Sequence, residues 1–333
     1  MNHRRNRSGI SLTDVVVVLA MVAVLLTLTL PAMQGSREDE RRQSCLVRMK
    51  NLSLSMHLYH DNYQQLPASA FYNDGKNLGD KDIALKTVVP GQGGKEATSA
   101  PYGFIVKVLP YVEQGHLFDQ IDFKNRAAFD KGNEPLAAKV LPVFNCPSFQ
   151  GEQHSKAKDY DKFAAGGPKP ALMQYKALGA TTLKVLQDAK LATEPTGDGG
   201  VLIPYKTYSI ATLKAPTMTA VFCETRESNY AAWWDGTTDS IPGFDPTIDK
   251  DTSATKPALW TTEQNHAFMP VGTFGGTEAM QWGPSSEHPG VVNHAFGGTE
   301  TRSIKTDIDP KIYAAVITRR PDDNGDIGEY FKD

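Results

Sequence analysis

The first 33 residues, MNHRRNRSGISLTDVVVVLAMVAVLLTLTLPAM, decide which fold this sequence predicts. A short leader, residues 1–9, contains several arginines and ends in Gly9. After residues 10–14, an uncharged stretch of 19 residues extends from Val15 to Met33. A helix of this length measures roughly 28 Å at about 1.5 Å per residue, close to the thickness of a bilayer core. We therefore expect a transmembrane or filament-core helix over residues 10–33.

The same segment resembles a prepilin-type (class III) signal: a polar leader ending in glycine, a hydrophobic residue, and a carboxylate at the fifth position after the glycine. The resemblance implies that prepilin peptidase cleaves between Gly9 and Ile10, that Ile10 is then N-methylated, and that the apolar helix stays on the mature protein. It also implies that Asp14 pairs with the N-terminal amine of a neighbouring subunit. Asp14 stands where pilins usually have Glu, and Ile10 where they often have Phe.

Two other interpretations of this segment can be weighed. A secretory signal needs a small-residue cleavage site after its apolar region, and Leu30-Pro31-Ala32 fits that requirement poorly. A plain single-span anchor explains the apolar stretch but not Asp14, because a carboxylate is costly in an apolar span. The arginines of residues 4–7 place the leader in the cytoplasm by the positive-inside rule. We expect a single-pass precursor in the inner membrane with a periplasmic head, found later in a pseudopilus or at the cell surface.

The helix is predicted to continue beyond the apolar stretch, over residues 34–66. Pro31 should kink it by removing a backbone hydrogen bond. Apolar residues then recur at steps of four and three, which is one stripe of an amphipathic helix that packs against a head: Cys45, Met49, Leu52, Met56, Tyr59 and Tyr63. A smaller apolar set lies on nearly the opposite side and should contact wrapping head residues or another subunit: Val47, Leu54 and Leu58.

Composition describes an ordinary globular head after this helix. The chain has 35 basic and 38 acidic residues, a net charge of −3, and therefore no basic field that would indicate a nucleic-acid partner. Residues 67–333 suffice for one large domain, with surface-loop insertions predicted near 75–101 and 235–257. The predicted fold class is α+β and pilin-like: a long N-terminal helix, half transmembrane and half amphipathic, packed on an enlarged antiparallel sheet.

Several blocks along the chain resemble an uncharacterised, pseudopilin-like bacterial family whose members have a prepilin N-terminus and a pilin-like extracellular domain. The blocks are residues 41–45, 58–67, 109–117, 144–148 and 285–296. Members of that family typically end in a His, nine further residues and an Asp-Gly pair. After His288, Gly298-Thr299 occupies the position of that pair. The resemblance implies an architecture and an export route, but no reaction.

The replaced Asp-Gly pair is interpreted as a turn. Two strands flank Gly297-Gly298, whose glycines can supply the positive φ of a tight hairpin. Asp309-Pro310 is typical of a helix N-terminus, opening a short helix through Val316. Residues 104–111 remain ambiguous between helix and strand. The predicted strands are Met173–Leu178, Thr217–Cys223, Val291–Phe296 and Glu300–Ile304.

Three cysteines in an exported protein predict one disulfide and one unpaired thiol. The family resemblance favours Cys45–Cys146, because Cys146 lies in a block similar to the family whereas Cys223 stands where the family does not usually have cysteine. The other pairings, and three buried thiols without a bridge, stay open.

Candidate chemical sites are few, and no catalytic residue is predicted. His57 and His60 are interpreted as surface positions. A zinc or hydrolase role for His288 or His294 would need a carboxylate partner that the sequence does not place, so His288 is expected to hold a loop by hydrogen bonding. Calcium is the only cofactor hypothesis. Side-chain oxygens alternate along a loop near the end of the sequence, although the glycine of an EF-hand is missing there: Asp322, Asn324, Asp326 and Glu329.

These patterns together predict a non-enzymatic, pilin-like structural subunit of a type II secretion or type IV pilus-like filament. Its expected partners are prepilin peptidase, the inner membrane and other pilin-like subunits. The alternative is a membrane-anchored extracellular module that binds a ligand and never polymerises. Such a module would use its tryptophans for recognition: Trp233, Trp234, Trp260 and Trp282.

Overall fold

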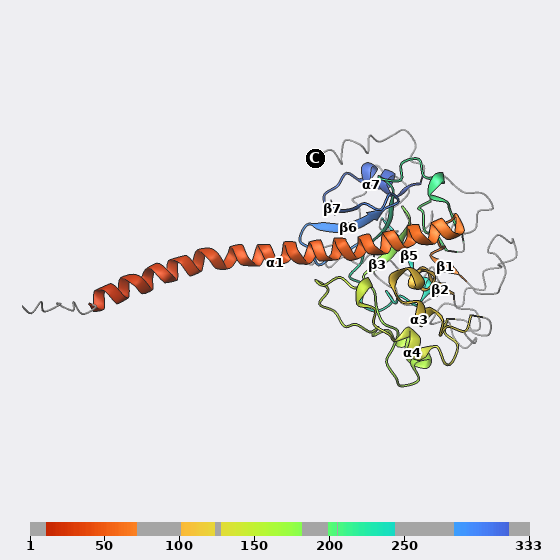
Figure 1. The fold of residues 1–333 in the computed structure, drawn as a ribbon, viewed down its shortest axis with the longest axis horizontal. Helices are drawn as coiled ribbons and strands as arrows, with labels where there is room; N and C mark the ends of the chain where they lie inside the picture. Colours follow the sequence, from red (N-terminus) through yellow and green to blue (C-terminus); the bar gives the residue numbers. More distant parts are fainter. Residues whose placement is uncertain are drawn as a thin grey trace, which may run out of the picture. The chain divides into compact units, whose positions relative to one another are not determined.

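The structure, a computed structural model, describes residues 11–71, 101–123, 128–181, 199–204, 206–243 and 283–319. The chain divides into two compact units, Met1–Gln43 and Ser44–Asp333. The 52-residue helix α1 (Leu12–Tyr63) contributes residues to both units (Figure 1). The helix continues without a break through Pro31. It ends at Tyr63, within the range that the sequence predicts.

The prediction of a transmembrane half in α1 is wrong. Among the described residues, no helix is long and apolar enough to cross a membrane. A span needs about 20 consecutive, predominantly apolar residues. The prediction treated uncharged residues as equivalent to apolar ones, although the stretch includes Thr27, Thr29 and Pro31. Two predictions are therefore wrong. They are the pilin-like fold with a transmembrane half-helix and the inner-membrane localisation derived from it.

The second unit is built on a five-stranded sheet, so that the protein is α+β. The strand order is β5-β3-β4-β6-β7. The strands are β3 (Tyr175–Ala180), β4 (Ala220–Glu224), β5 (Ser240–Pro242), β6 (Val291–Phe296) and β7 (Thr301–Lys305). Neighbouring strands are antiparallel except β3 and β5, which pair in parallel. The predicted all-antiparallel sheet is therefore wrong at this edge, where part of the loop predicted at 235–257 forms β5.

One face of the sheet is covered by the part of α1 that belongs to the second unit. The predicted stripe is buried from Cys45 to Tyr59, and its residues up to Met56 pack in the main hydrophobic core with Tyr175 and Phe222. Tyr63, the last residue of the stripe, is 61% exposed, because the helix ends there. The opposite set stays exposed in this chain: Val47, Leu54 and Leu58.

The other face of the sheet is covered by α7 (Pro310–Ile317; Figure 1), which packs with residues of β3, β4, β6 and β7 in a second hydrophobic cluster. Its start agrees with the prediction, since the Asp309 carboxylate accepts a hydrogen bond from the backbone N–H of Ile312 at 3.3 Å. Successive strand residues point to opposite faces, so β6 contributes Val292 to the α7 side and Ala295 to the α1 side.

Short elements complete the second unit. The segment 104–111, ambiguous in sequence, is helical: α2 (Phe104–Val108) continues into the 3-10 turn η1 (Leu109–Val112). A two-stranded sheet joins β1 (Ala70–Phe71) to β2 (Tyr102–Gly103). The other short helices are α3 (Gly115–Phe118), α4 (Glu134–Ala137), η2 (Pro142–Phe144), η3 (Lys158–Tyr160), α5 (Asp161–Ala164), η4 (Ile210–Thr212) and η5 (Gly236–Thr238).

Candidate functional site

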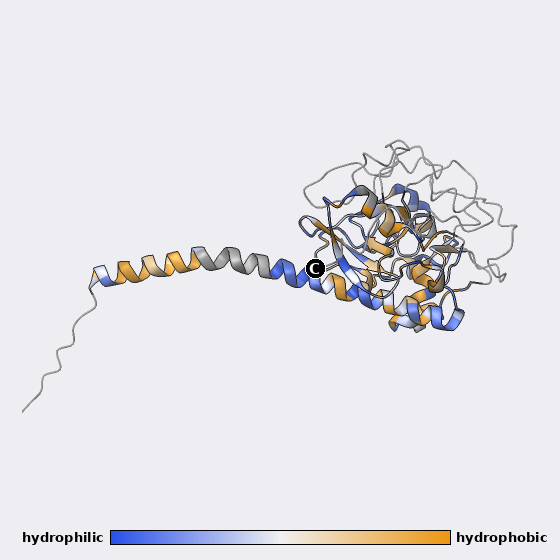
Figure 2. Cartoon of the chain, turned by 90° about the horizontal axis from the view of Figure 1, so that it is seen from above, coloured by the Kyte–Doolittle hydropathy of each residue, from blue (hydrophilic) through white to orange (hydrophobic). Residues whose placement is uncertain are grey.

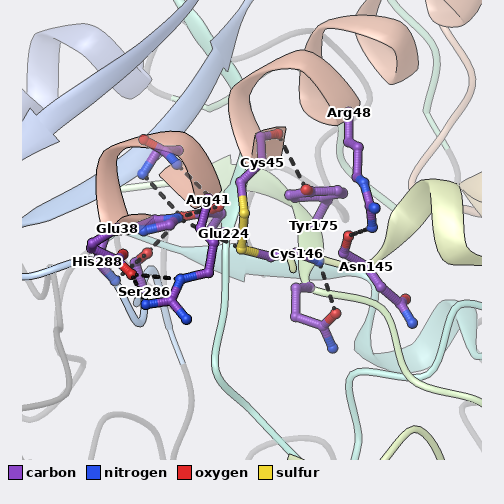
Figure 3. The surroundings of a disulfide bond; sticks show 12 residues. Glu38, Arg41, Cys45, Arg48, Asn145, Cys146, Tyr175, Glu224, Ser286 and His288 are labelled. Atoms are coloured by element: carbon purple, nitrogen blue, oxygen red, sulfur yellow. Dashed lines mark hydrogen bonds and ion pairs between the residues drawn. A yellow bond between two sulfur atoms is a disulfide. The ribbon is translucent and has the colours of Figure 1, made fainter. Parts of the chain in front are cut away.

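Four buried side chains that can bind metal meet in the second unit, between α1 and the end of the central strand β4. They are Cys45, Cys146, Glu224 and His288, and one ligand atom from each lies within 4.8 Å of all the others. All four are buried. Figure 3 shows Glu224 and His288 beside the sulfur atoms of the two cysteines. We refer to these four residues as the sulfur–carboxylate cluster.

A disulfide joins the two sulfur atoms of the cluster. Cys45 and Cys146 are bonded, with Cα atoms 5.0 Å apart and a separation of 101 positions in sequence. This is the pairing that the family resemblance favours. The third cysteine, Cys223, is free and buried, and burial raises the pKa of its thiol.

Hydrogen bonds position both ends of the disulfide (Figure 3). On α1, the carbonyl of Cys45 accepts a hydrogen bond from the hydroxyl of Tyr175 at 3.2 Å. Across the bridge, the backbone N–H of Cys146 donates to the side-chain oxygen of Gln174 at 3.2 Å. One turn further along α1, Arg48 donates to the carbonyls of Pro142 and Asn145 at 2.8 and 2.7 Å. The helix is therefore attached to the η2 loop by polar contacts as well as by the covalent bond.

Glu224 supplies a carboxylate in an otherwise apolar strand end. Its Oε2 accepts hydrogen bonds from the hydroxyl of Ser286 at 2.6 Å and from the backbone N–H of Asn293 at 3.3 Å. Its Oε1 accepts from the amide of Asn293 at 3.1 Å. These donors hold the carboxylate in one orientation and compensate for its burial.

His288 completes the cluster from the loop before β6. Its Nε2 lies 3.6 Å from the sulfur of Cys146 and 3.6 Å from Oε1 of Glu224. Its backbone N–H donates to the hydroxyl of Ser286 at 3.2 Å. The carboxylate partner that sequence reasoning could not place is Glu224, which is 64 positions away along the chain. The only sequence signal was a glutamate directly after the apolar run of residues 220–223.

A second polar cluster joins Lys176 of β3 to Asp239, the residue directly before β5. Lys176 donates to the carboxylate of Asp239 and to the carbonyl of Ala232, and the lysine and Asp239 are fully buried. Burial raises the pKa of Asp239 to about 7, although the charge of Lys176 acts in the opposite direction. The second carboxylate oxygen accepts from the backbone N–H of Phe104 at 2.9 Å. Since its groups are satisfied inside the fold, this cluster is structural.

The remaining sequence candidates have structural partners. His57 donates through Nε2 to the carbonyl of Gly297 at 2.9 Å, and His60 contacts the hydroxyl of Ser209 at 3.0 Å. Both histidines therefore attach α1 to the rest of the second unit. His294 is fully buried beside Tyr313. Trp233 and Trp234 are fully buried in the main core.

Several predicted residues lie outside the described ranges. These are Gly9 and Ile10 of the cleavage site, the four calcium-loop residues Asp322, Asn324, Asp326 and Glu329, and the tryptophans Trp260 and Trp282. The same holds for the insertion predicted at 75–101, apart from its last residue. These predictions stay predictions.

The hairpin that replaces the family's Asp-Gly pair differs from the expected one. The positive φ falls on Thr299, at 76°, and not on either glycine. Thr299 occupies the position of the glycine in the family pair. A side chain at Gly297 would meet a methyl group of Leu213 at 2.6 Å, and one at Gly298 would meet Thr217 at 2.8 Å. The two glycines are therefore needed for close approach, and the left-handed position is held by a β-branched residue.

Replacing Thr299 by glycine is expected to raise the free energy of unfolding by about 1 kcal/mol, because a left-handed conformation costs a β-branched residue roughly that much. Urea unfolding, followed by the fluorescence of the buried tryptophans, measures the change. Thr299→Ala is the matched control, since it removes the hydroxyl but keeps a Cβ at positive φ. A glycine variant that is no more stable than the alanine variant would show that the turn is unstrained.

Residues 34–311 match the profile of a protein family described as "Protein of unknown function (DUF1559)". No curated protein and no solved structure matches the chain. The match covers α1 after its first half, the whole sheet and all four residues of the sulfur–carboxylate cluster.

Proposed function

The chain belongs to the DUF1559 family of proteins of unknown function, and from this premise we propose that it is a pilin-like structural subunit that assembles through the N-terminal part of α1. In this proposal, prepilin peptidase cleaves the precursor between Gly9 and Ile10, and copies of the mature chain then bundle their first helices. The proposed activity is structural, without catalysis.

One observation supports the proposal most strongly: the apolar side chains at the start of α1 are exposed. Their exposed fractions range from 44% to 80%, and Figure 2 shows hydrophobic residues following one another around this part of the helix. They are Leu12, Val15, Val16, Val17, Val18, Leu19, Met21, Val22, Val24, Leu25 and Leu26. Exposed apolar surface on this scale marks an interaction site. A helix that is apolar all round needs partners on every side, which a bundle of identical helices provides.

Asp14 is the only charged residue between positions 10 and 33. Its Oδ2 accepts a hydrogen bond from the backbone N–H of Ser11 at 3.1 Å, and the Ser11 hydroxyl accepts from the N–H of Thr13 at 3.4 Å. This reciprocal arrangement is a capping box that starts the helix. A carboxylate has more acceptor sites than one N–H fills, so Asp14 can also accept from the amine of Ile10 in a neighbouring subunit. In a bundle of apolar helices, that pairing would offset the cost of burying the charge.

The proposal is tested on the full chain, produced in a host that has a prepilin peptidase. Mass spectrometry should find a mature N-terminus at Ile10 carrying one methyl group, and electron microscopy should find filaments. An intact Met1, or an N-terminus beyond Ala32, would contradict the processing step and the assembly that depends on it.

Replacing Asp14 by asparagine is expected to abolish filament assembly, because the amide keeps an oxygen for the N–H of Ser11 but loses the charge that pairs with an amine. Filaments are counted by electron microscopy and by sedimentation of assembled material. Ser11→Ala is the matched control: it removes the capping hydroxyl and leaves Asp14 in place, so assembly should persist. Equal assembly by the wild-type and Asp14→Asn chains would refute the pairing.

A further inference from the structure

We propose that the sulfur–carboxylate cluster is a redox-dependent zinc site: once the Cys45–Cys146 disulfide is reduced, the two thiolates, Nε2 of His288 and the carboxylate of Glu224 bind a single Zn²⁺ ion. The inference rests on the position of four potential ligands of three chemical kinds within 4.8 Å of one another. It is independent of filament assembly and concerns residues of the second unit only.

The spacing of the ligand atoms fits a tetrahedral zinc ion. With Zn–S bonds of about 2.3 Å and Zn–N or Zn–O bonds of about 2.0–2.2 Å, neighbouring ligand atoms of a tetrahedron lie about 3.3–3.8 Å apart. The sulfur of Cys146 and Nε2 of His288 are 3.6 Å apart, as are Nε2 and Oε1 of Glu224. Two edges of the tetrahedron are thus already present. Cleavage of the disulfide lets the two sulfur atoms separate to form the others.

The ligand set has the chemistry that zinc prefers. Thiolate, imidazole and carboxylate all bind Zn²⁺, and four protein ligands in a buried position make a closed, structural site. Outer-sphere hydrogen bonds orient metal ligands, and here Ser286 and Asn293 already orient the carboxylate of Glu224. The two positive charges of the ion would offset most of the negative charge of two thiolates and one carboxylate.

Reduction requires a donor of two electrons, and a dithiol is the class we propose. Cys146 as a residue is 7% exposed, whereas Cys45 is fully buried. One thiolate of the dithiol therefore attacks the sulfur of Cys146, and Cys45 leaves as a thiolate. The second thiol then attacks the mixed disulfide and releases Cys146. The dithiol ends as a disulfide, and its two protons pass to the two cysteines. Binding of Zn²⁺ displaces both protons, so that the affinity for zinc rises with pH.

The consequence is that α1 stays attached to the sheet in both redox states. The disulfide links Cys45 on the helix to Cys146 in the loop after η2. The zinc ion would link the same two residues and add β4 through Glu224 and the loop before β6 through His288. A chain that folds before it is oxidised would therefore already hold its helix in place.

The test uses purified full-length protein, reduced with a phosphine in place of a dithiol so that the reductant competes little for the metal. Zinc binding is measured by competition with a chromophoric chelator, and Co²⁺ is used as a spectroscopic probe. The variants are Glu224→Gln and His288→Gln, both first shown by circular dichroism to be folded in the oxidised state. Cys223→Ser is the matched control, since Cys223 is a buried thiol outside the cluster.

We expect the reduced wild type and Cys223→Ser to bind one metal ion per chain, with thiolate-to-cobalt charge-transfer bands and a higher melting temperature in zinc. The oxidised wild type should not bind. Both glutamine variants should lose on the order of 100-fold or more in affinity, since loss of a direct ligand should exceed the effect of losing an outer-sphere partner. The proposal is overturned if the reduced wild type binds no zinc, if it unfolds and zinc does not restore it, or if both glutamine variants bind as tightly as wild type.

Discussion

Replacing Cys45 and Cys146 together by alanine is expected to lower the free energy of unfolding by about 4–5 kcal/mol. The bridge joins residues that are 101 positions apart, and in the chain-entropy account a loop of about 100 residues is worth roughly 4.7 kcal/mol, because the open chain has many more unfolded conformations. Alanine avoids the burial of unpaired hydroxyl groups that serine would introduce at these buried positions.

The measurement is urea unfolding of the oxidised full chain, with a chelator present so that metal binding cannot contribute. Cys223→Ala serves as the control: it removes a buried thiol without breaking a bridge and should cost about 1 kcal/mol, as small cavities do. If the double variant lost no more stability than twice this control, the bridge would have no stabilising effect of its own.

The disulfide fixes the start of the packed part of α1. Cys45 is the first buried residue of the apolar stripe, so the disulfide acts where the packed part of the helix begins. Further along, Arg48 and His57 attach the helix through hydrogen bonds to loop carbonyls. The double variant should therefore lose order first at the start of the stripe, which hydrogen exchange at residues 44–49 would detect.

The sequence predicted the elements whose pattern is local. The stripe from Cys45 to Tyr59 is visible because its period matches a helix that packs on one side. β6 was predicted with its observed bounds because it leads directly into the turn glycines Gly297-Gly298, with a second predicted strand after them. Helix α7 was predicted from Asp309-Pro310 alone. In each case the residues that decide the structure lie within a few positions of one another.

Features that depend on distant residues could not be predicted in the same way. The parallel pairing of β5 with β3 involves only three residues of β5, and nothing in Ser240–Pro242 indicates its partner. The sulfur–carboxylate cluster brings together positions 45, 146, 224 and 288, which only the folded sheet makes adjacent. The left-handed turn residue at Thr299 could not be predicted, because threonine rarely adopts a positive φ.

Acidification is expected to destabilise the fold through His294. The ring is fully buried: Nδ1 lies 2.9 Å from the carbonyl of Val292, and Nε2 lies 2.9 Å from the hydroxyl of Tyr313. A carbonyl only accepts, so Nδ1 carries the proton and Nε2 accepts from the tyrosine. Burial disfavours the charged ring and lowers its pKa from 6.5 to about 4, mainly by desolvation.

The sign of the effect follows from this shift. Between about pH 6.5 and about pH 4 the unfolded chain binds a proton at His294 that the folded chain does not, so the contribution of this residue to stability is complete above 6.5 and is lost as the pH falls to 4. A shift of this size corresponds to about 3 kcal/mol. Asp239 acts in the opposite direction, because its pKa is raised to about 7 and its protonation favours the folded chain.

The wild-type pH profile is therefore a sum of opposing effects, and only a difference between variants isolates His294. His294→Gln keeps a donor and an acceptor but cannot titrate, whereas the Asp239 contribution is the same in both chains. The free-energy gap between wild type and His294→Gln should shrink by about 3 kcal/mol on acidification from about pH 6.5 to about pH 4. Tyr313→Phe is the comparison: it removes the hydroxyl that donates to Nε2 but keeps the titrating ring buried, so its gap to wild type should change less over this range than that of His294→Gln. A gap for His294→Gln that is constant with pH would mean that the folded chain accepts the proton as readily as the unfolded one, which burial of the ring forbids.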